Sequence, residues 1–99
     1  MQRLILSWMN KYNINFTTQF LRKYKKITKN NLLLVRITKT KLHMLAQDPF
    51  QPPLKTHKYK QKFSTSITGD LRIIWNFTKP DEITLFNFRG HEGKLDIYK

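Results

Sequence analysis

The residue types with the most chemical potential in this chain are concentrated between residues 63 and 98. One strand-like run carries Arg72, a second ends in Arg89-Gly90-His91, and the segment closes with Tyr98. Guanidinium groups bind phosphate through paired N–H donors, and an imidazole exchanges protons near neutral pH. Together with a phenol, these groups suit the chemistry of phosphodiesters.

A large excess of positive charge accompanies these residues. The 99 residues include 19 Lys and Arg against 6 Asp and Glu, and the formal net charge is +13. Ten of the basic residues precede the first acid, Asp48. Such a surface attracts polyanions, whereas mixed charges would serve solubility equally well. Composition therefore favours nucleic acid or an acidic protein as the partner.

Length and composition predict one domain. Ninety-nine residues, 39% of them hydrophobic and 13% aromatic, are enough for one packed core and too few for two. The absence of cysteine excludes disulfides and thiolate zinc sites, and makes the cytoplasm the default location. Residues 13–99 are assigned to this domain. Residues 1–12 are assigned to an N-terminal extension of open role, because their apolar run is too short for a signal peptide or a membrane span.

The first half of the domain has the apolar spacing of two helices. Apolar residues recur at helical intervals from Phe20 to Ile27, after a hydroxyl cap at Thr17-Thr18, and again from Leu34 to Leu45. Turn residues separate the two runs, which predicts a helical hairpin with a cationic outer face. A strand-like segment, residues 13–16, precedes the hairpin.

The second half has the period of two that is typical of strands. Alternation begins at Phe63, and turn signals at residues 68–70 and 79–82 divide it into three runs, which predicts an antiparallel meander. The order is thus β-α-α-β-β-β, an α+β fold in which the helical hairpin covers one face of the sheet. Arg72 is expected on the other face, which stays open to a ligand.

Residues 48–62 contain three prolines and are expected to form a connecting loop. The segment ends in alternating basic and ring residues, His57-Lys58-Tyr59-Lys60-Gln61-Lys62. Lysines can bind phosphates while rings stack on bases, so His57, Lys60 and Lys62 are candidates for RNA binding, together with Arg89. A solvated loop without such a role is an equally good interpretation.

Two segments resemble motifs of the RelE/ParE superfamily, small basic toxins of type II toxin–antitoxin modules. Ser64-Thr65-Ser66-Ile67-Thr68-Gly69-Asp70-Leu71-Arg72-Ile73-Ile74-Trp75 is similar to a strand–turn–strand segment of the family. Gly90-His91-Glu92-Gly93-Lys94-Leu95-Asp96-Ile97-Tyr98 is similar to its closing glycine, histidine and tyrosine motif. The resemblance spans roughly residues 14–98. It implies the RelE-like, microbial-ribonuclease-like fold, with the helical hairpin against a curved antiparallel sheet.

The RelE-, YoeB- and YafQ-like branch is favoured, and for it the resemblance implies cleavage of mRNA, commonly on the ribosome, by attack of the RNA's own 2′-hydroxyl. The reaction is metal-independent and needs no cofactor. Arg72 corresponds to the family's phosphate-binding arginine, His91 to an acid or base, and Tyr98 to a terminal aromatic for stacking or proton transfer. The partners implied are a cognate acidic antitoxin, in a hetero-oligomer, and mRNA with the ribosome. No membrane association is expected.

The sequence also departs from the family pattern. Many active members carry lysine or arginine where this chain has Ser64 and Ser66, and no Asp or Glu is well placed as a general base. Lys60, Lys62 or Arg89 would have to supply the missing positive charge. Two alternatives therefore stay open: a ParE-like inhibitor of DNA gyrase, and a catalytically inactive basic domain that binds nucleic acid.

Overall fold

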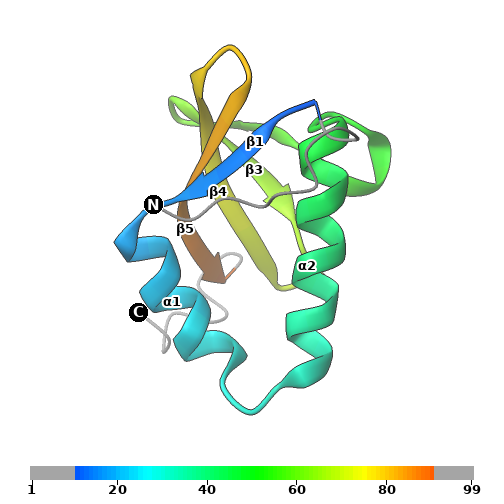
Figure 1. Ribbon diagram of the computed structural model, residues 1–99. Coiled ribbons are helices and arrows are strands. Elements are labelled where there is room, and N and C mark those ends of the chain that lie inside the picture. The colour runs from blue at the N-terminus through cyan, green and yellow to red at the C-terminus, as the bar shows by residue number, and fades with distance from the viewer. Residues whose placement is uncertain (1–10, 91–99) are drawn as a thin grey trace.

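The computed structural model describes residues 11–90, which form two helices packed on a five-stranded sheet (Figure 1). The predicted order of a strand, two helices and an antiparallel meander is confirmed. In chain order the elements are β1 (Asn13–Phe16), α1 (Thr18–Thr28), α2 (Leu32–Gln47), the 3₁₀ helix η2 (Pro52–Leu54), β2 (His57–Tyr59), β3 (Lys62–Ser66), β4 (Leu71–Lys79) and β5 (Glu82–Gly90).

The strands lie in the order β1-β5-β4-β3-β2. Strands β2 to β5 pair with their sequence neighbours in antiparallel fashion, but β1 pairs in parallel with β5, from Asn13 opposite Glu82 to Phe16 opposite Leu85. A parallel partner needs a long crossover connection, and the helices with the meander provide it. The sheet is therefore mixed, and only its β2–β5 part is antiparallel.

The connection expected to be a loop contains a further strand, so the loop prediction is wrong for His57–Tyr59. This strand, β2, pairs with β3, and Tyr59 lies opposite Lys62. The two-residue turn Lys60-Gln61 closes the hairpin, and Lys60 has a φ of 58°. Three residues are too few to show a period of two, which explains why the sequence pattern did not reveal this edge strand.

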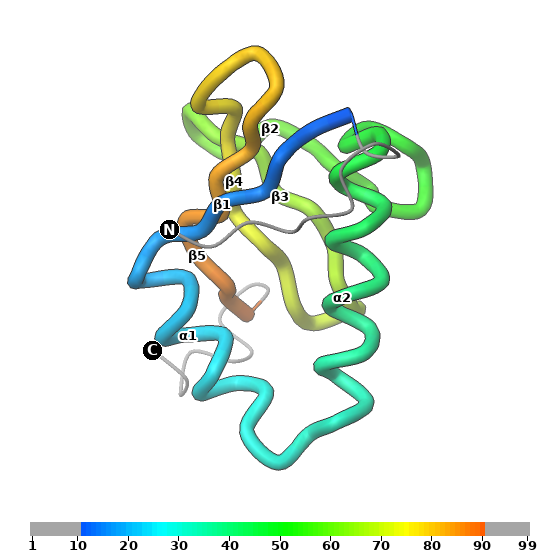
Figure 2. The backbone as a smooth tube through the Cα atoms, viewed as in Figure 1, coloured from blue at the N-terminus to red at the C-terminus, as the bar shows by residue number. Residues whose placement is uncertain are grey.

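Both helices begin at a side-chain cap. Thr17 Oγ1 accepts a hydrogen bond from the backbone N–H of Phe20 at 3.1 Å, and Asn31 Oδ1 accepts one from Leu34 at 3.0 Å. The ring of Phe20 lies 5.9 Å from that of Phe88, so α1 packs on β5. Figure 2 shows α1 and α2 diverging from the turn that joins them. No helix in the described part of the chain is long and apolar enough to cross a membrane.

A series of hydrogen bonds connects the buried part of the sheet with the segment between α2 and β2. Trp75 Nε1 donates to Thr65 Oγ1 at 2.7 Å, the hydroxyls of Thr65 and Thr56 lie 2.7 Å apart, and Thr56 donates to the Pro49 carbonyl at 2.6 Å. An indole nitrogen only donates and a carbonyl only accepts, so Thr65 donates to Thr56. The chain of bonds ties Thr56, the residue before β2, to the centre of the molecule.

Candidate functional site

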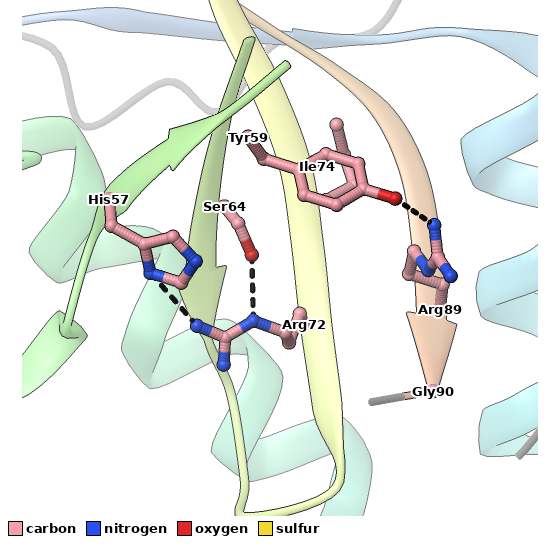
Figure 3. A pocket seen from close by; sticks show the side chains of 7 residues that line it. All are labelled: His57, Tyr59, Ser64, Arg72, Ile74, Arg89 and Gly90. Carbon is pink, nitrogen blue, oxygen red and sulfur yellow. Dashed lines mark hydrogen bonds between the residues drawn. The ribbon is translucent and has the colours of Figure 1, made fainter. Parts of the chain in front are cut away.

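The sheet face opposite the helices carries a cationic pocket of about 230 Å³ (Figure 3). Four strands line it, with His57 and Tyr59 from β2, Ser64 from β3, Arg72 and Ile74 from β4, and Arg89 and Gly90 from β5. These lining residues include two guanidinium groups and no carboxylate. Two neighbouring positive charges favour a negative ligand between them. The pocket is therefore suited to an anion.

Strand register places the two arginines together. Arg72 on β4 pairs directly with Arg89 on β5, and Ser66 on β3 pairs with Arg72 from the other side. Residues in direct register lie about 5 Å apart and project from the same face of the sheet. Both guanidinium groups thus occupy the open face, as a shared phosphate contact requires.

Two side chains hold the Arg72 guanidinium in place (Figure 3). Its Nε donates to Ser64 Oγ at 2.7 Å, and its Nη2 lies 3.1 Å from His57 Nδ1. Ser64 is only 1% exposed, which makes it a fixed acceptor. Within residues 11–90, Nη1 makes no hydrogen bond. Ser64, expected from the sequence to mark the loss of a positive charge, is therefore a partner of Arg72, and donors of Arg72 remain for a ligand.

The contact with Arg72 fixes the tautomer of His57. A guanidinium has no acceptor, so the bond from Arg72 requires the lone pair on Nδ1 and places the ring proton on Nε2. The same Nδ1 lies 3.4 Å from the backbone carbonyl oxygen of Lys55, a contact that would require an Nδ1 proton. The shorter distance to Arg72 favours the Nε2-protonated ring. The Nδ1 lone pair of His57 is thus the acceptor for Arg72 at the pocket, and Nε2 carries the ring proton.

Arg89 is held in turn by Tyr59. Its Nη1 donates to the Tyr59 hydroxyl, and its guanidinium carbon lies 5.4 Å from the centre of the tyrosine ring. Figure 3 shows the tyrosine hydroxyl directed at Arg89, with His57 and Arg72 facing each other beside them. Cation–π contact and hydrogen bond together fix the second guanidinium over the open face.

The structure brings together some of the predicted site residues. His57, Arg72 and Arg89 line the cationic pocket, whereas Lys60 and Lys62 line an adjoining pocket with Arg89. His91 and Tyr98 lie outside the described residues. Tyr59 and Ser64 were not among the predicted site residues. The period of two in β3 places Ser64 on the same face as Arg72, and this was the signal that could have found it.

The sequence matches no protein-family model and no curated protein, but its fold matches solved toxin structures. A YoeB/ParE toxin from Agrobacterium tumefaciens is 16% identical, with a TM-score of 0.68 over 79% of this chain and 96% of that chain. A chain of the heterotetrameric YoeB–YefM toxin–antitoxin complex from Staphylococcus aureus is 20% identical, with a TM-score of 0.66 over 81% of this chain and 97% of that chain. A chain of the E. coli DinJ–YafQ toxin–antitoxin complex is 14% identical, with a TM-score of 0.59 over 85% of this chain and 97% of that chain.

At these identities the likeness shows the fold. The chain has the fold of the YoeB and YafQ toxins and spans nearly their full length. The fold that the resemblance to the RelE/ParE superfamily implied is confirmed. Because one fold hosts several functions, the activity has to be argued from the pocket.

Proposed function

We propose that this chain is the toxin of a type II toxin–antitoxin module and inhibits translation as a metal-independent mRNA endoribonuclease, acting on the ribosome. One observation carries the proposal: Arg72 and Arg89 converge with His57 on a pocket whose described lining has no carboxylate. An arginine pair that served only the fold would be expected to have acidic partners. The likeness of fold to YoeB and YafQ toxins supports the same reading.

The proposed reaction is attack of an RNA 2′-oxygen on the adjacent phosphorus. The O2′–P bond forms and the P–O5′ bond breaks, leaving a 2′,3′-cyclic phosphate and a 5′-hydroxyl. Negative charge grows on the non-bridging oxygens in the transition state, and donors fixed in advance stabilise it most. Arg72 and Arg89 are the donors, held in advance by Ser64 and Tyr59.

In the proposal His57 is the general base, because the described lining of the pocket holds no carboxylate for that role. Its Nδ1 lone pair accepts from Arg72 in the free protein. When Nη2 exchanges Nδ1 for a phosphate oxygen, while Nε stays bonded to Ser64, this lone pair is released beside the phosphate and takes the 2′ proton. An imidazole is suited to this step near neutral pH.

The leaving group needs a proton from an acid. Gly90 lines the pocket, and His91 is the next residue in the sequence. The resemblance to YoeB- and YafQ-like toxins makes His91 the proposed acid for O5′, and Tyr98 the proposed aromatic for stacking or proton transfer.

The proposed protein partner is a cognate acidic antitoxin. Two of the similar structures described above are toxin–antitoxin complexes. A formal net charge of +13 is electrostatically complementary to an acidic protein partner. Acidic side chains inserted between Arg72 and Arg89 would exclude RNA. The proposal places the chain in the cytoplasm, where mRNA and ribosomes are found.

Expression of the chain in a bacterial host, followed by mapping of mRNA 5′ ends, tests the proposal. We expect new ends carrying a 5′-hydroxyl within reading frames, and their loss with Arg72→Ala. Lys39→Ala is the matched control, because it removes one exposed positive charge from α2, a helix that lines neither the cationic pocket nor the adjoining one, and should cleave normally. Arrested growth with intact mRNA and inhibited gyrase supercoiling would overturn the nuclease and favour the ParE-like alternative.

A further inference from the structure

A β-bulge in β5 places two consecutive side chains on the open face. Ile74 on β4 pairs with Asn87, but the next residue, Trp75, pairs with Leu85, so Phe86 is an extra residue without a partner on β4. Bulges are frequent beside functional sites, where they redirect a side chain. Because of the bulge, Phe86 projects to the same side as Asn87, and both line one pocket.

This second pocket, of about 460 Å³, adjoins the cationic pocket. The two pockets share Tyr59, Ile74 and Arg89, so the second begins where the first ends. The first presents two guanidinium groups, whereas in the second the Phe86 ring is added to the Ile74 side chain that both pockets share. A phosphate site and an apolar site thus lie side by side on the sheet.

Ammonium groups lie over the aromatic rings of the second pocket. Lys62 Nζ is 5.1 Å from the centre of the Phe86 ring, and Lys60 Nζ is 5.5 Å from that of Tyr59. Binding of a phosphate alone would require the positive charges and not the aromatic rings. A ring combined with cations suits a ligand that is flat, apolar on its faces and attached to an anion. A nucleobase on its phosphodiester chain has these properties.

The conformation of Lys60 points to a role for its charge. Its φ of 58° lies in the left-handed region, which costs a residue with a side chain about 1–2 kcal/mol and favours glycine. Strained backbone concentrates at functional sites, where the surrounding structure maintains it. A lysine retained at such a position, on the rim of the second pocket, is consistent with a contact to a phosphate.

We propose that the second pocket is a nucleobase subsite, in which one base of the RNA stacks on Phe86 while Lys60 and Lys62 turn to the flanking phosphates. The subsite rests on the proposed nuclease function and adds to it a contact with the base next to the phosphate held by Arg72 and Arg89. Stacking tolerates every base, so this contact strengthens binding more than it selects a sequence.

Binding of an RNA that cannot be cleaved tests the subsite separately from catalysis. The probes are a 2′-O-methyl trinucleotide and three versions of it, each lacking one base, with Kd measured by NMR titration. We expect removal of one particular base to weaken binding roughly 5- to 150-fold, the range measured for single stacked bases. The Phe86→Leu variant should weaken binding of the complete trinucleotide similarly. It should weaken binding much less when that base is already absent.

Phe50→Leu is the matched control, because Phe50 is a phenylalanine that lines neither pocket. It is 52% exposed, and its ring packs 5.3 Å from that of Phe63. This variant should respond to base removal as the unsubstituted protein does. An equal effect of Phe86→Leu on complete and abasic probes would overturn the subsite. So would the absence of any binding by the unsubstituted protein, whereas the nuclease is judged separately by cleavage of ribosome-bound mRNA. Base-dependent binding without mRNA cleavage would support the subsite and contradict the nuclease alone.

Discussion

Arg72 and His57 lie on strands β4 and β2, 15 residues apart in the sequence, and Arg72 Nη2 is 3.1 Å from His57 Nδ1. This contact joins the phosphate-binding group of the proposed reaction to its proposed base. While it persists, the lone pair of the base is occupied. In the proposed reaction a phosphate takes the place of His57 as the partner of Arg72 Nη2, so binding of the substrate makes the lone pair of the base available.

The tautomer of His57 is the first testable consequence. We expect the free protein to have an Nε2-protonated His57 ring, because Arg72 can only donate to Nδ1. Long-range ¹H–¹⁵N NMR correlations distinguish the two nitrogens. Addition of inorganic phosphate should shift the Nδ1 resonance as the guanidinium moves. An Nδ1-protonated ring, bound to the Lys55 carbonyl, would contradict this arrangement.

Ser64→Ala should lower the rate of mRNA cleavage about tenfold. It removes the acceptor of Arg72 Nε, and a hydrogen bond to a charged group contributes about 1.5–3 kcal/mol. Ser66→Ala is the matched control. That hydroxyl lies on the same strand but donates to the Thr68 carbonyl in the turn. Equal rates for the two variants, measured on ribosome-bound mRNA, would show that Ser64 does not position the arginine.

The same substitution at two buried threonines should change stability in opposite directions. Thr65→Val breaks the bonds to Trp75 and Thr56 and should lower the free energy of unfolding by about 2–3 kcal/mol, since it leaves the buried Trp75 N–H without an acceptor and the Thr56 hydroxyl without its donor. Thr38 Oγ1 is buried and has no hydrogen-bond partner among the described residues, so Thr38→Val should raise the free energy of unfolding by about 1 kcal/mol. Urea denaturation measures both, and effects of the same sign would contradict this account of the core.

Lys60→Gly should stabilise the fold and weaken RNA binding. Glycine relieves the positive φ, for a gain of about 1 kcal/mol in the free energy of unfolding, but removes a charge from the pocket rim. The slope of the logarithm of the binding constant against the logarithm of salt concentration should become smaller by about 0.7, the value for one phosphate contact with single-stranded nucleic acid. Lys55→Gly relieves a similar φ of 49° outside both pockets and should leave RNA binding unchanged. Tighter binding by Lys60→Gly would contradict the role of its charge.

The sequence predicted the elements that have strong periodicity. Alternation from Phe63 onward predicted β3, β4 and β5, and helical spacing predicted the hairpin, because these patterns record which side chains are buried. Strand β2 was missed since three residues carry no measurable period. The direction of Phe86 was missed because a bulge interrupts the alternation.

The candidate site was only partly predictable for a related reason. Residue types alone singled out Arg72, Arg89 and His57, but their meeting depends on register and on β2, which composition does not encode. Ser64 looked like the loss of a cation. Its function as a fixed acceptor for Arg72 becomes visible only when its burial and its distance are known together.

Single-turnover cleavage of ribosome-bound mRNA by the purified chain tests the central claim most directly. We predict a product with a 2′,3′-cyclic phosphate and no cleavage when the 2′-hydroxyl at the cut site is replaced by hydrogen. Arg72→Ala should lower the rate by about 10²-fold or more. His57→Ala should show a loss of similar size. Cleavage that persists without the 2′-hydroxyl, or mRNA that stays intact with the unsubstituted chain, would contradict the account.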